Sequence, residues 1–111
     1  MLKPGHYDLR VYRSRSGQSP YFEWLKSLDQ KTQDRIVTRV ARLSLGQFGD
    51  FKSLDRGLYE LRLFFGPGYR VYFGEHRNMI ILILSGGDKS RQSKDIKAAK
   101  EFWNSYLEDN R

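Results

Sequence analysis

The sequence predicts a single α+β domain with the element order β-α-α-β-β-β-α. Three observations support this order. An alternating apolar and polar stretch near the start predicts a strand, two stretches with helical spacing follow it, and three strand-like segments with short turns precede a last helical stretch. Short turns join neighbouring antiparallel strands, so we expect a mainly antiparallel, four-stranded sheet with an N-terminal helical pair and a C-terminal helix. The 111 residues form one core-sized unit, and residues 1–111 show no linker or repeat.

The first third of the chain predicts one strand and one short helix. From Tyr7 to Arg13 apolar and polar residues roughly alternate, as they do in a half-buried strand. Ser19 can cap a helix that has Pro20 at its first position, where proline costs no hydrogen bond. The apolar side chains of this segment predict a short helix that ends near Ser27.

A second helix is predicted from Asp29, which can act as its N-cap, to a stop at Gly46. Its apolar residues recur at spacings of three and four, as on the buried side of an amphipathic helix. The other side carries a basic stripe, made up of Lys31, Arg35, Arg39 and Arg42. A surface helix needs a polar side, so we interpret this stripe as a solvated surface that attracts anions at long range at most.

The second half predicts a structured loop, three strands and a helix. The segment Gln47 to Gly57 is rich in turn residues and holds Lys52, so we expect a loop pinned by aromatic side chains. The predicted strands are Leu58 to Phe64, Tyr69 to Phe73 and Met79 to Leu84. His76 falls in the turn before the last strand. Apolar residues at helical spacing from Ile96 onward predict the C-terminal helix.

Composition limits the function classes. There are 20 Lys and Arg against 13 Asp and Glu, which gives a formal charge of +7 and a pI near 9.8, so an anionic partner is expected. The chain has no cysteine, and its two histidines lack a ligand spacing, so we expect neither a disulfide, nor a metal site, nor a cofactor. No long apolar run indicates a membrane segment, and the expected location is the cytoplasm.

Strand alternation places a charged set of side chains on one sheet face. Apolar residues such as Leu61 and Val71 fall on one side, and the opposite side carries Glu60, Arg62, Arg70 and Tyr72, with Arg10 and Tyr12 of the first strand added. Guanidinium groups bind phosphates and tyrosine rings stack on unpaired bases, so single-stranded RNA or DNA is the best-matched ligand. The competing interpretation is an ordinary solvated sheet face without a ligand.

Several motifs in a fixed order resemble those of a known family. They are Phe22-Glu23-Trp24-Leu25, Leu45-Gly46-Gln47-Phe48-Gly49-Asp50, Gly57-Leu58-Tyr59-Glu60-Leu61-Arg62, Gly66-Pro67-Gly68-Tyr69-Arg70-Val71-Tyr72-Phe73 and Leu84-Ser85-Gly86-Gly87-Asp88-Lys89-Ser90-Arg91-Gln92, with Asp95-Ile96 after them. The chain is similar in these motifs to the RelE/ParE toxin superfamily, and within it to the phage-derived Gp49 or HigB-like branch, the addiction module killer proteins. The resemblance implies a RelE-like fold.

The resemblance also implies a function. It indicates the toxin of a type II toxin-antitoxin system, a metal-independent endoribonuclease that cuts messenger RNA on the ribosome by attack of the ribose 2′-hydroxyl. The implied partners are the ribosome, its messenger RNA and a cognate antitoxin of helix-turn-helix type from the adjacent reading frame, in a toxin-antitoxin hetero-oligomer. Two alternatives stay open, a DNA gyrase inhibitor of ParE type and a catalytically inactive RNA-binding relative.

The same resemblance assigns the candidate site. The catalytic set that it implies is Lys52, Glu60, Arg62, Arg70, Tyr72 and Lys89. The RNA-binding set contains Lys52, Arg62, Arg70 and Lys89 from the resemblance, with Arg10 and Tyr12 added by the strand alternation described above. Arg62 and Arg70 are expected to hold the scissile phosphate and its developing charge. Lys89 stands where many relatives of RelE have His or Tyr, so Glu60, Tyr72 and Lys89 are all left as possible acids or bases.

Overall fold

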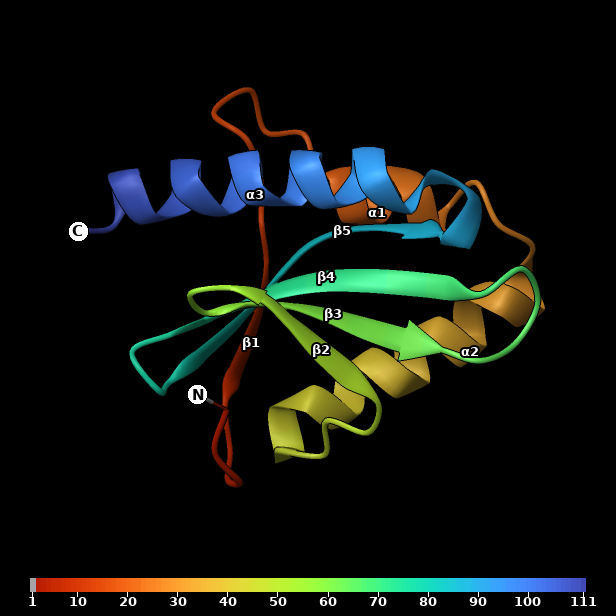
Figure 1. Cartoon of the computed structure of the whole chain (residues 1–111), viewed down its shortest axis with the longest axis horizontal. Helices are drawn as coiled ribbons and strands as arrows, with labels where there is room; N and C mark the ends of the chain where they lie inside the picture. The colour runs from red at the N-terminus through yellow and green to blue at the C-terminus, as the bar shows by residue number, and fades with distance from the viewer. Residues whose placement is uncertain (1) are drawn as a thin grey trace.

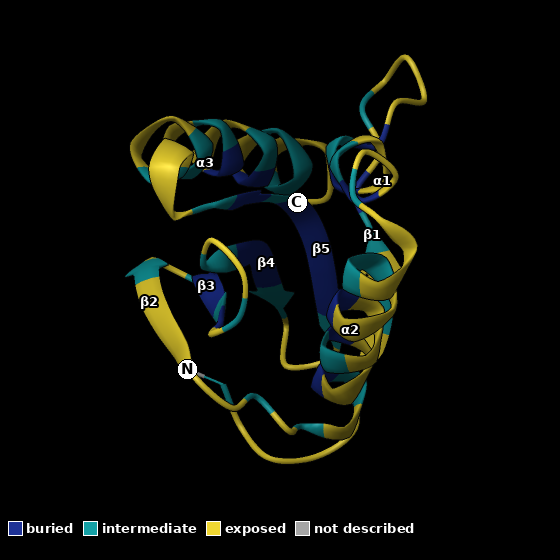
Figure 2. Cartoon of the chain, turned by 90° about the vertical axis from the view of Figure 1, so that its right-hand side faces the viewer, coloured by how far each residue is buried: buried dark blue, intermediate teal, exposed yellow. Residues whose placement is uncertain are grey.

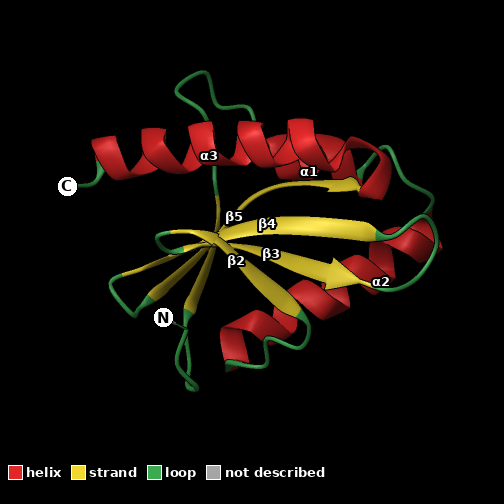
Figure 3. Cartoon of the chain, in the orientation of Figure 1, coloured by secondary structure: helices red, strands yellow, loops and turns green. Residues whose placement is uncertain are grey.

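The computed structural model describes residues 2–111 as an α+β domain (Figure 1, Figure 3). Its elements in chain order are β1 (Asp8–Val11), α1 (Pro20–Leu25), α2 (Gln30–Ala41), the 3-10 turn η1 (Arg42–Leu45), β2 (Phe51–Asp55), β3 (Leu58–Leu63), β4 (Tyr69–His76), β5 (Ile80–Asp88), the 3-10 turn η2 (Lys89–Arg91) and α3 (Gln92–Asp109). The predicted order of elements is therefore correct, with one strand added between α2 and β3.

The sheet has five strands in the order β1-β5-β4-β3-β2. Strands β2 to β5 form an antiparallel meander, whereas β1 lies parallel to β5, with Asp8 opposite Ile80 and Val11 opposite Ile83. The sheet is thus mixed. Parallel strands cannot be joined by a tight turn. Helices α1 and α2 and strands β2 to β4 therefore lie between β1 and its partner β5 in the chain.

The expectation of four strands is wrong by one, because the segment predicted as a loop contains β2. Phe51 pairs with Leu61 and Lys52 with Glu60, so Lys52 lies on an edge strand. Four of the five β2 residues are exposed. A strand exposed on both faces lacks the alternation by which a half-buried strand is recognised, and the turn residues around it dominate the pattern.

The helix boundaries follow the predicted caps. The Ser19 hydroxyl accepts a hydrogen bond from the Phe22 amide at 3.2 Å, and the Asp29 carboxylate accepts one from the Thr32 amide at 3.2 Å. At the other end of α2 the chain tightens into η1 and stops at Gly46, whose φ of 74° is left-handed. These caps satisfy amides and carbonyls that have no partner inside the helix.

Helices cover both faces of the sheet (Figure 2). Two neighbouring glycines of β5 show this arrangement, because a Cβ atom on Gly86 would overlap the Trp24 ring of α1 and one on Gly87 would overlap the Asp95 carboxylate of α3. Successive residues of a strand point to opposite faces. Helices α1 and α3 therefore lie on opposite sides of β5, and glycine allows each to approach closely.

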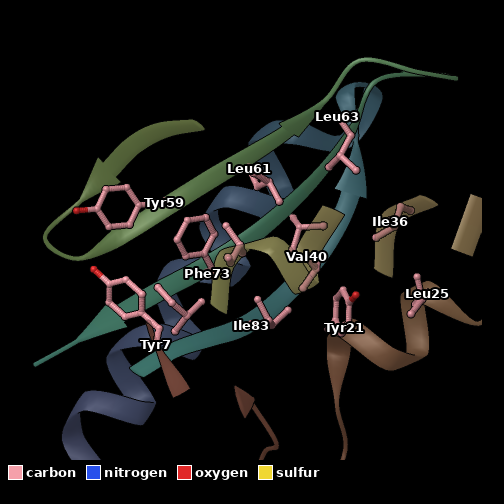
Figure 4. Close-up of a cluster of buried hydrophobic side chains, with 13 residues drawn as sticks. Tyr7, Tyr21, Leu25, Ile36, Val40, Tyr59, Leu61, Leu63, Phe73 and Ile83 are labelled. Carbon is pink, nitrogen blue, oxygen red and sulfur yellow. The ribbon is translucent and has the colours of Figure 1, made fainter. Parts of the chain in front are cut away.

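The main core lies between the sheet and the helical pair α1–α2 (Figure 4). Leu61, Phe73 and Ile83 point from three strands toward Ile36 and Val40 of α2, and all five are at least 95% buried. This is the apolar face predicted from strand alternation. Its burial removes from water the side chains that dominate the hydrophobic stabilisation.

The opposite face carries α3 and a second apolar cluster. Trp103 of α3 packs with Leu58, Leu82 and Leu84 of the sheet, and its indole Nε1 donates to the Arg56 carbonyl at 3.0 Å. Both interpretations of the charged sheet face assumed that it is exposed, whereas α3 covers part of it. The last helix of the chain closes over it because its own apolar side needs a partner.

Candidate functional site

The predicted polar residues of β3 and β4 do lie together, in two rows across the sheet. The first row consists of Lys52, Glu60, Tyr72 and Ser85, and the second of Arg62, Arg70 and Gly87. Residues directly opposite each other in antiparallel strands share a face. We call Glu60, Arg62, Arg70 and Tyr72, with Gln92 and Asp95 of α3, the strand-face cluster.

Glu60 is the anchor of the strand-face cluster. It is completely buried, its Oε1 accepts a hydrogen bond from Arg62 Nε at 3.2 Å, and its Oε2 accepts one from Gln92 Nε2 at 2.8 Å. A buried carboxylate requires partners of this kind. Glu60 therefore fixes the guanidinium of Arg62, whose side chain is 30% exposed and reaches solvent.

Arg70 lies opposite Arg62 and is buried. Only 8% of the residue is exposed, and its Nε and Nη1 are buried with no hydrogen-bond partner among residues 2–111. Buried donors are nearly always paired, and an unpaired guanidinium is costly. An anion or an ordered water molecule that enters the cluster could supply the missing acceptors.

Tyr72 and Asp95 complete the cluster beneath Arg70. Burial raises the pKa of the Tyr72 phenol above its usual range, and the carboxylates of Glu60 and Asp95 raise it further. Burial likewise raises the pKa of the Asp95 carboxyl. Among residues 2–111 the Tyr72 hydroxyl and the Asp95 Oδ2 are buried with no hydrogen-bond partner. Tyr72 thus keeps its proton near neutral pH and can donate a hydrogen bond, but it is no base.

Gln92 and Asp95 had not been assigned a role from the sequence. Both stand in the first turn of α3, where Asp95 lies over Gly87 and Gln92 reaches Glu60. The resemblance motifs contained both residues, and a polar first helical turn is ordinarily solvated. The sequence signal that could have placed α3 here is the glycine pair Gly86 and Gly87 on β5, since glycine in a strand marks the close approach of another element.

Lys52 and Lys89 lie at the rim. Lys52 is exposed on β2, opposite Glu60, and Lys89 is exposed in η2, beside Gly68 of the β3–β4 turn. Within residues 2–111 neither ammonium group forms an ion pair, so both are accessible to a ligand. The cluster therefore combines two strand arginines with two lysines at its edge.

Arg10 and Tyr12 do not join the cluster. Arg10 is paired with Asp8 at 2.6 Å, and Tyr12 is buried against the Phe102 ring, with 5.5 Å between ring centroids. Arg10 of β1 lies in register with Leu82 of β5, and Leu82 lies in register with Gly74 of β4. The Trp103 ring of α3 packs directly over Gly74. The prediction of Arg10 and Tyr12 beside the strand arginines is wrong, because α3 stands between them.

The basic stripe of α2 is only partly the solvated surface that we expected. Arg35, Arg39 and Arg42 line a cavity of about 650 Å³, with Arg62 at the end of β3 on its other side. Arg39 donates from Nη2 to the Phe48 carbonyl at 2.7 Å, and burial lowers its pKa. The stripe and the strand-face cluster therefore meet at Arg62.

The remaining titratable residues offer no second catalytic constellation. His76 lies at the end of β4 rather than in a turn, and its Nδ1 is 3.0 Å from the Tyr106 hydroxyl of α3. In residues 2–111 no three His, Asp or Glu side chains gather as metal ligands would. No helix of the described chain has the length and apolar character that crossing a membrane requires.

Comparison with known proteins gives one informative relationship. No model of a known protein family matches the chain. An uncharacterized protein of Haemophilus influenzae is 46% identical over 78 residues, which is 69% of this chain and 79% of that protein. Identity at this level over most of a small domain shows common descent. The chain belongs to the same protein family as this Haemophilus influenzae protein.

Proposed function

We propose that this chain is the toxin of a type II toxin-antitoxin pair, a metal-independent endoribonuclease that cuts messenger RNA on the ribosome. The observation that carries the proposal is the buried, unpaired guanidinium of Arg70 opposite Arg62. Two guanidinium groups side by side suit a phosphate, which accepts paired hydrogen bonds from each. The ordered motifs that resemble those of RelE-like and HigB-like toxins support the same conclusion.

The reaction that fits this cluster is internal transesterification of RNA. The ribose 2′-hydroxyl gives up its proton to a solvent water molecule, and its oxygen forms a bond to the adjacent phosphorus. The bond from phosphorus to the 5′-oxygen breaks, and the 5′-oxygen takes up a proton, which leaves a 2′,3′-cyclic phosphate and a 5′-hydroxyl. Negative charge grows on the phosphate oxygens in the transition state, and preorganised donors stabilise it there. Arg62 and Arg70 supply these donors, and the exposed ammonium groups of Lys52 and Lys89 can protonate the leaving oxygen.

Glu60 takes a positioning role in this proposal. Both its oxygens already accept hydrogen bonds, one from Arg62 and one from Gln92, and no part of it is exposed. It therefore holds the Arg62 guanidinium in place without touching the RNA. Tyr72, which keeps its proton, contributes as a hydrogen-bond donor from beneath.

Mapping transcript 5′ ends after induced expression tests the proposal. Wild type is expected to stop growth and to produce codon-phased cuts in translated messages. Arg70→Ala and Arg62→Gln should lose both effects while keeping the native circular dichroism spectrum, and Arg10→Gln, outside the cluster, should keep them. Full toxicity of a folded Arg70→Ala variant would refute the assignment. Growth arrest with intact transcripts and an SOS response would favour gyrase inhibition instead.

The proposed partners follow from this activity. They are the ribosome with its messenger RNA, in the cytoplasm, and a neutralising antitoxin of helix-turn-helix type in a hetero-oligomer. Co-expression with the adjacent reading frame tests the last of these. Rescue of growth and co-purification of both chains are expected, and a neighbouring frame that neither binds nor rescues would argue against the pair.

A further inference from the structure

The cavity between α2 and the end of β3 has the size and the lining of a ligand site. Its volume of about 650 Å³ lies within the range of roughly 300–1,000 Å³ that small-molecule sites occupy. Its wall on α2 and η1 includes Arg35, Arg39 and Arg42, and Arg62 of β3 and Phe64, directly after β3, line the opposite wall. The cavity therefore offers positive charge and an aromatic surface in one place.

The charges of the lining are only partly compensated. Four guanidinium groups face two carboxylates, those of Asp34 and Asp50. Asp34 accepts a hydrogen bond from Gln30 at 2.8 Å, and within residues 2–111 neither Arg35 nor Arg42 forms an ion pair. Arg42 is exposed to solvent and lines the cavity. An anionic group entering the cavity would find donors without displacing an existing partner.

Aromatic side chains give the cavity a second kind of contact. The Arg35 guanidinium lies 3.8 Å from the centroid of the Phe65 ring, as in a cation-π pair, and both residues line the cavity. Phe64 is 76% exposed, the most exposed large apolar side chain among the described residues. A base can stack on flat groups of this kind, whatever its identity.

Arg62 links the cavity to the strand-face cluster. It donates from Nε to Glu60 inside the cluster, and it is also one of the residues that line the cavity. A chain of nucleotides with one phosphate at Arg62 and Arg70 thus has a neighbouring nucleotide within reach of Phe64 and Arg42. We propose that the cavity binds one nucleotide of single-stranded RNA next to the scissile phosphate, an inference that rests on the proposed function.

The lining favours RNA over an acidic peptide. A peptide rich in Asp and Glu would match the arginines, but it would meet the carboxylates of Asp34 and Asp50 on the same walls. Those carboxylates can instead accept hydrogen bonds from the amino groups of bases. A nucleotide can contact all three kinds of group in the cavity. Its phosphate binds the arginines, its base stacks on the aromatic side chains, and the amino groups of its base donate to the carboxylates.

Binding of a short RNA by the purified chain tests this inference. The probe is a fluorescein-labelled, mixed-sequence hexanucleotide that is 2′-O-methylated, so that cleavage is blocked, and the readout is fluorescence anisotropy. Phe64→Ala should weaken binding about fivefold or more, because one stacked base is lost. Arg42→Gln should weaken it and lower the salt dependence. Lys31→Gln, on the same helix but away from the cavity, should bind within about twofold of wild type.

The outcomes separate this inference from the proposed function. Wild-type affinity in the folded Phe64→Ala variant, or no binding of the probe by any variant, would overturn it. Capture of an acidic decapeptide that depends on Arg42, without RNA binding, would assign the cavity to a protein partner instead. If Phe64 proves essential for binding while no transcript is cut in cells, the RNA site stands and the nuclease proposal fails. If codon-phased cuts occur unchanged in Phe64→Ala cells, the nuclease stands and the nucleotide subsite fails.

Discussion

Arg62 and Arg70 are paired across β3 and β4, but only Arg62 has a carboxylate partner. Like charges directly opposite each other in a sheet repel, and a buried guanidinium with unpaired donors adds a desolvation cost. The pair is therefore a locally unfavourable arrangement that a stable fold does not need. Such an arrangement fits a binding role.

The first prediction concerns Arg70→Met. Methionine has a similar volume, fits irregular spaces and carries no charge, so we expect the free energy of unfolding to rise by about 1–3 kcal/mol. Urea denaturation measures it, and toxicity should disappear in the same variant. A variant that unfolds more easily than wild type would show that Arg70 stabilises the fold, contrary to this prediction.

The second prediction concerns the buried carboxylate of Glu60. Glu60→Ala leaves Arg62 and Gln92 without their acceptor, and we expect a loss of about 1.5–3 kcal/mol, as for hydrogen bonds to charged groups. Glu60→Gln keeps one acceptor oxygen and should lose less. The comparison is made by urea denaturation at neutral pH, and equal stability of all three proteins would contradict the assigned hydrogen bonds.

The third prediction concerns Gly74 on β4. A Cβ atom there would overlap the Trp103 ring of α3, so Gly74→Ala should cost about 1–3 kcal/mol through overpacking. In the double variant Gly74→Ala/Trp103→Leu the smaller leucine leaves room for the added methyl group. Its loss of stability should therefore be smaller than the sum of the losses in the two single variants. Thermal unfolding of the four proteins provides the double-mutant cycle, and strictly additive losses would argue against the close approach.

The fourth prediction concerns the pH dependence contributed by His76. Burial and the neighbouring Arg77 lower the pKa of its imidazole below its usual value, although Glu75 opposes them, and Trp103 and Tyr106 of α3 pack against it. Between the two pKa values the unfolded chain binds more protons than the folded chain, so stability is lost as pH falls below about 6.5.

His76→Gln should remove this contribution while keeping a polar group near the Tyr106 hydroxyl. Urea midpoints at pH 7.5 and 5.5 provide the measurement. The drop between the two values should be smaller in the variant than in wild type. An identical drop in both proteins would show that other groups carry the acid sensitivity.

Strand alternation predicted the meander and its apolar face because that face is buried, as at Leu61 and Phe73. The same reasoning could not find β2, whose Lys52 and Ser53 are exposed on opposite faces and carry no contrast between them. An exposed edge strand is identified by its hydrogen bonds to the neighbouring strand. The spacing of apolar residues in the sequence does not predict that pairing. The fifth strand was therefore accessible only from the structure.

The burial of the strand-face cluster could not be predicted from the sequence either. Alternation correctly put Glu60, Arg62, Arg70 and Tyr72 on one face, but it said nothing of where α3 docks. A helix with an apolar side must cover some surface, and sequence spacing does not choose which one. The burial of Arg70, on which the functional proposal depends, arises from that docking.

The pairing of β1 with β5 has a consequence for the order in which the domain is completed. Asp8–Val11 finds its partner strand only in Ile80–Asp88, and α3 follows after that. During synthesis the N-terminal strand therefore waits unpaired until most of the chain has left the ribosome, and contacts so distant in sequence form slowly. The cluster around Arg70 also needs Gln92 and Asp95, so a nascent or truncated chain has no assembled site. The strand-face cluster therefore assembles only after all five strands and the first turn of α3 have been synthesised.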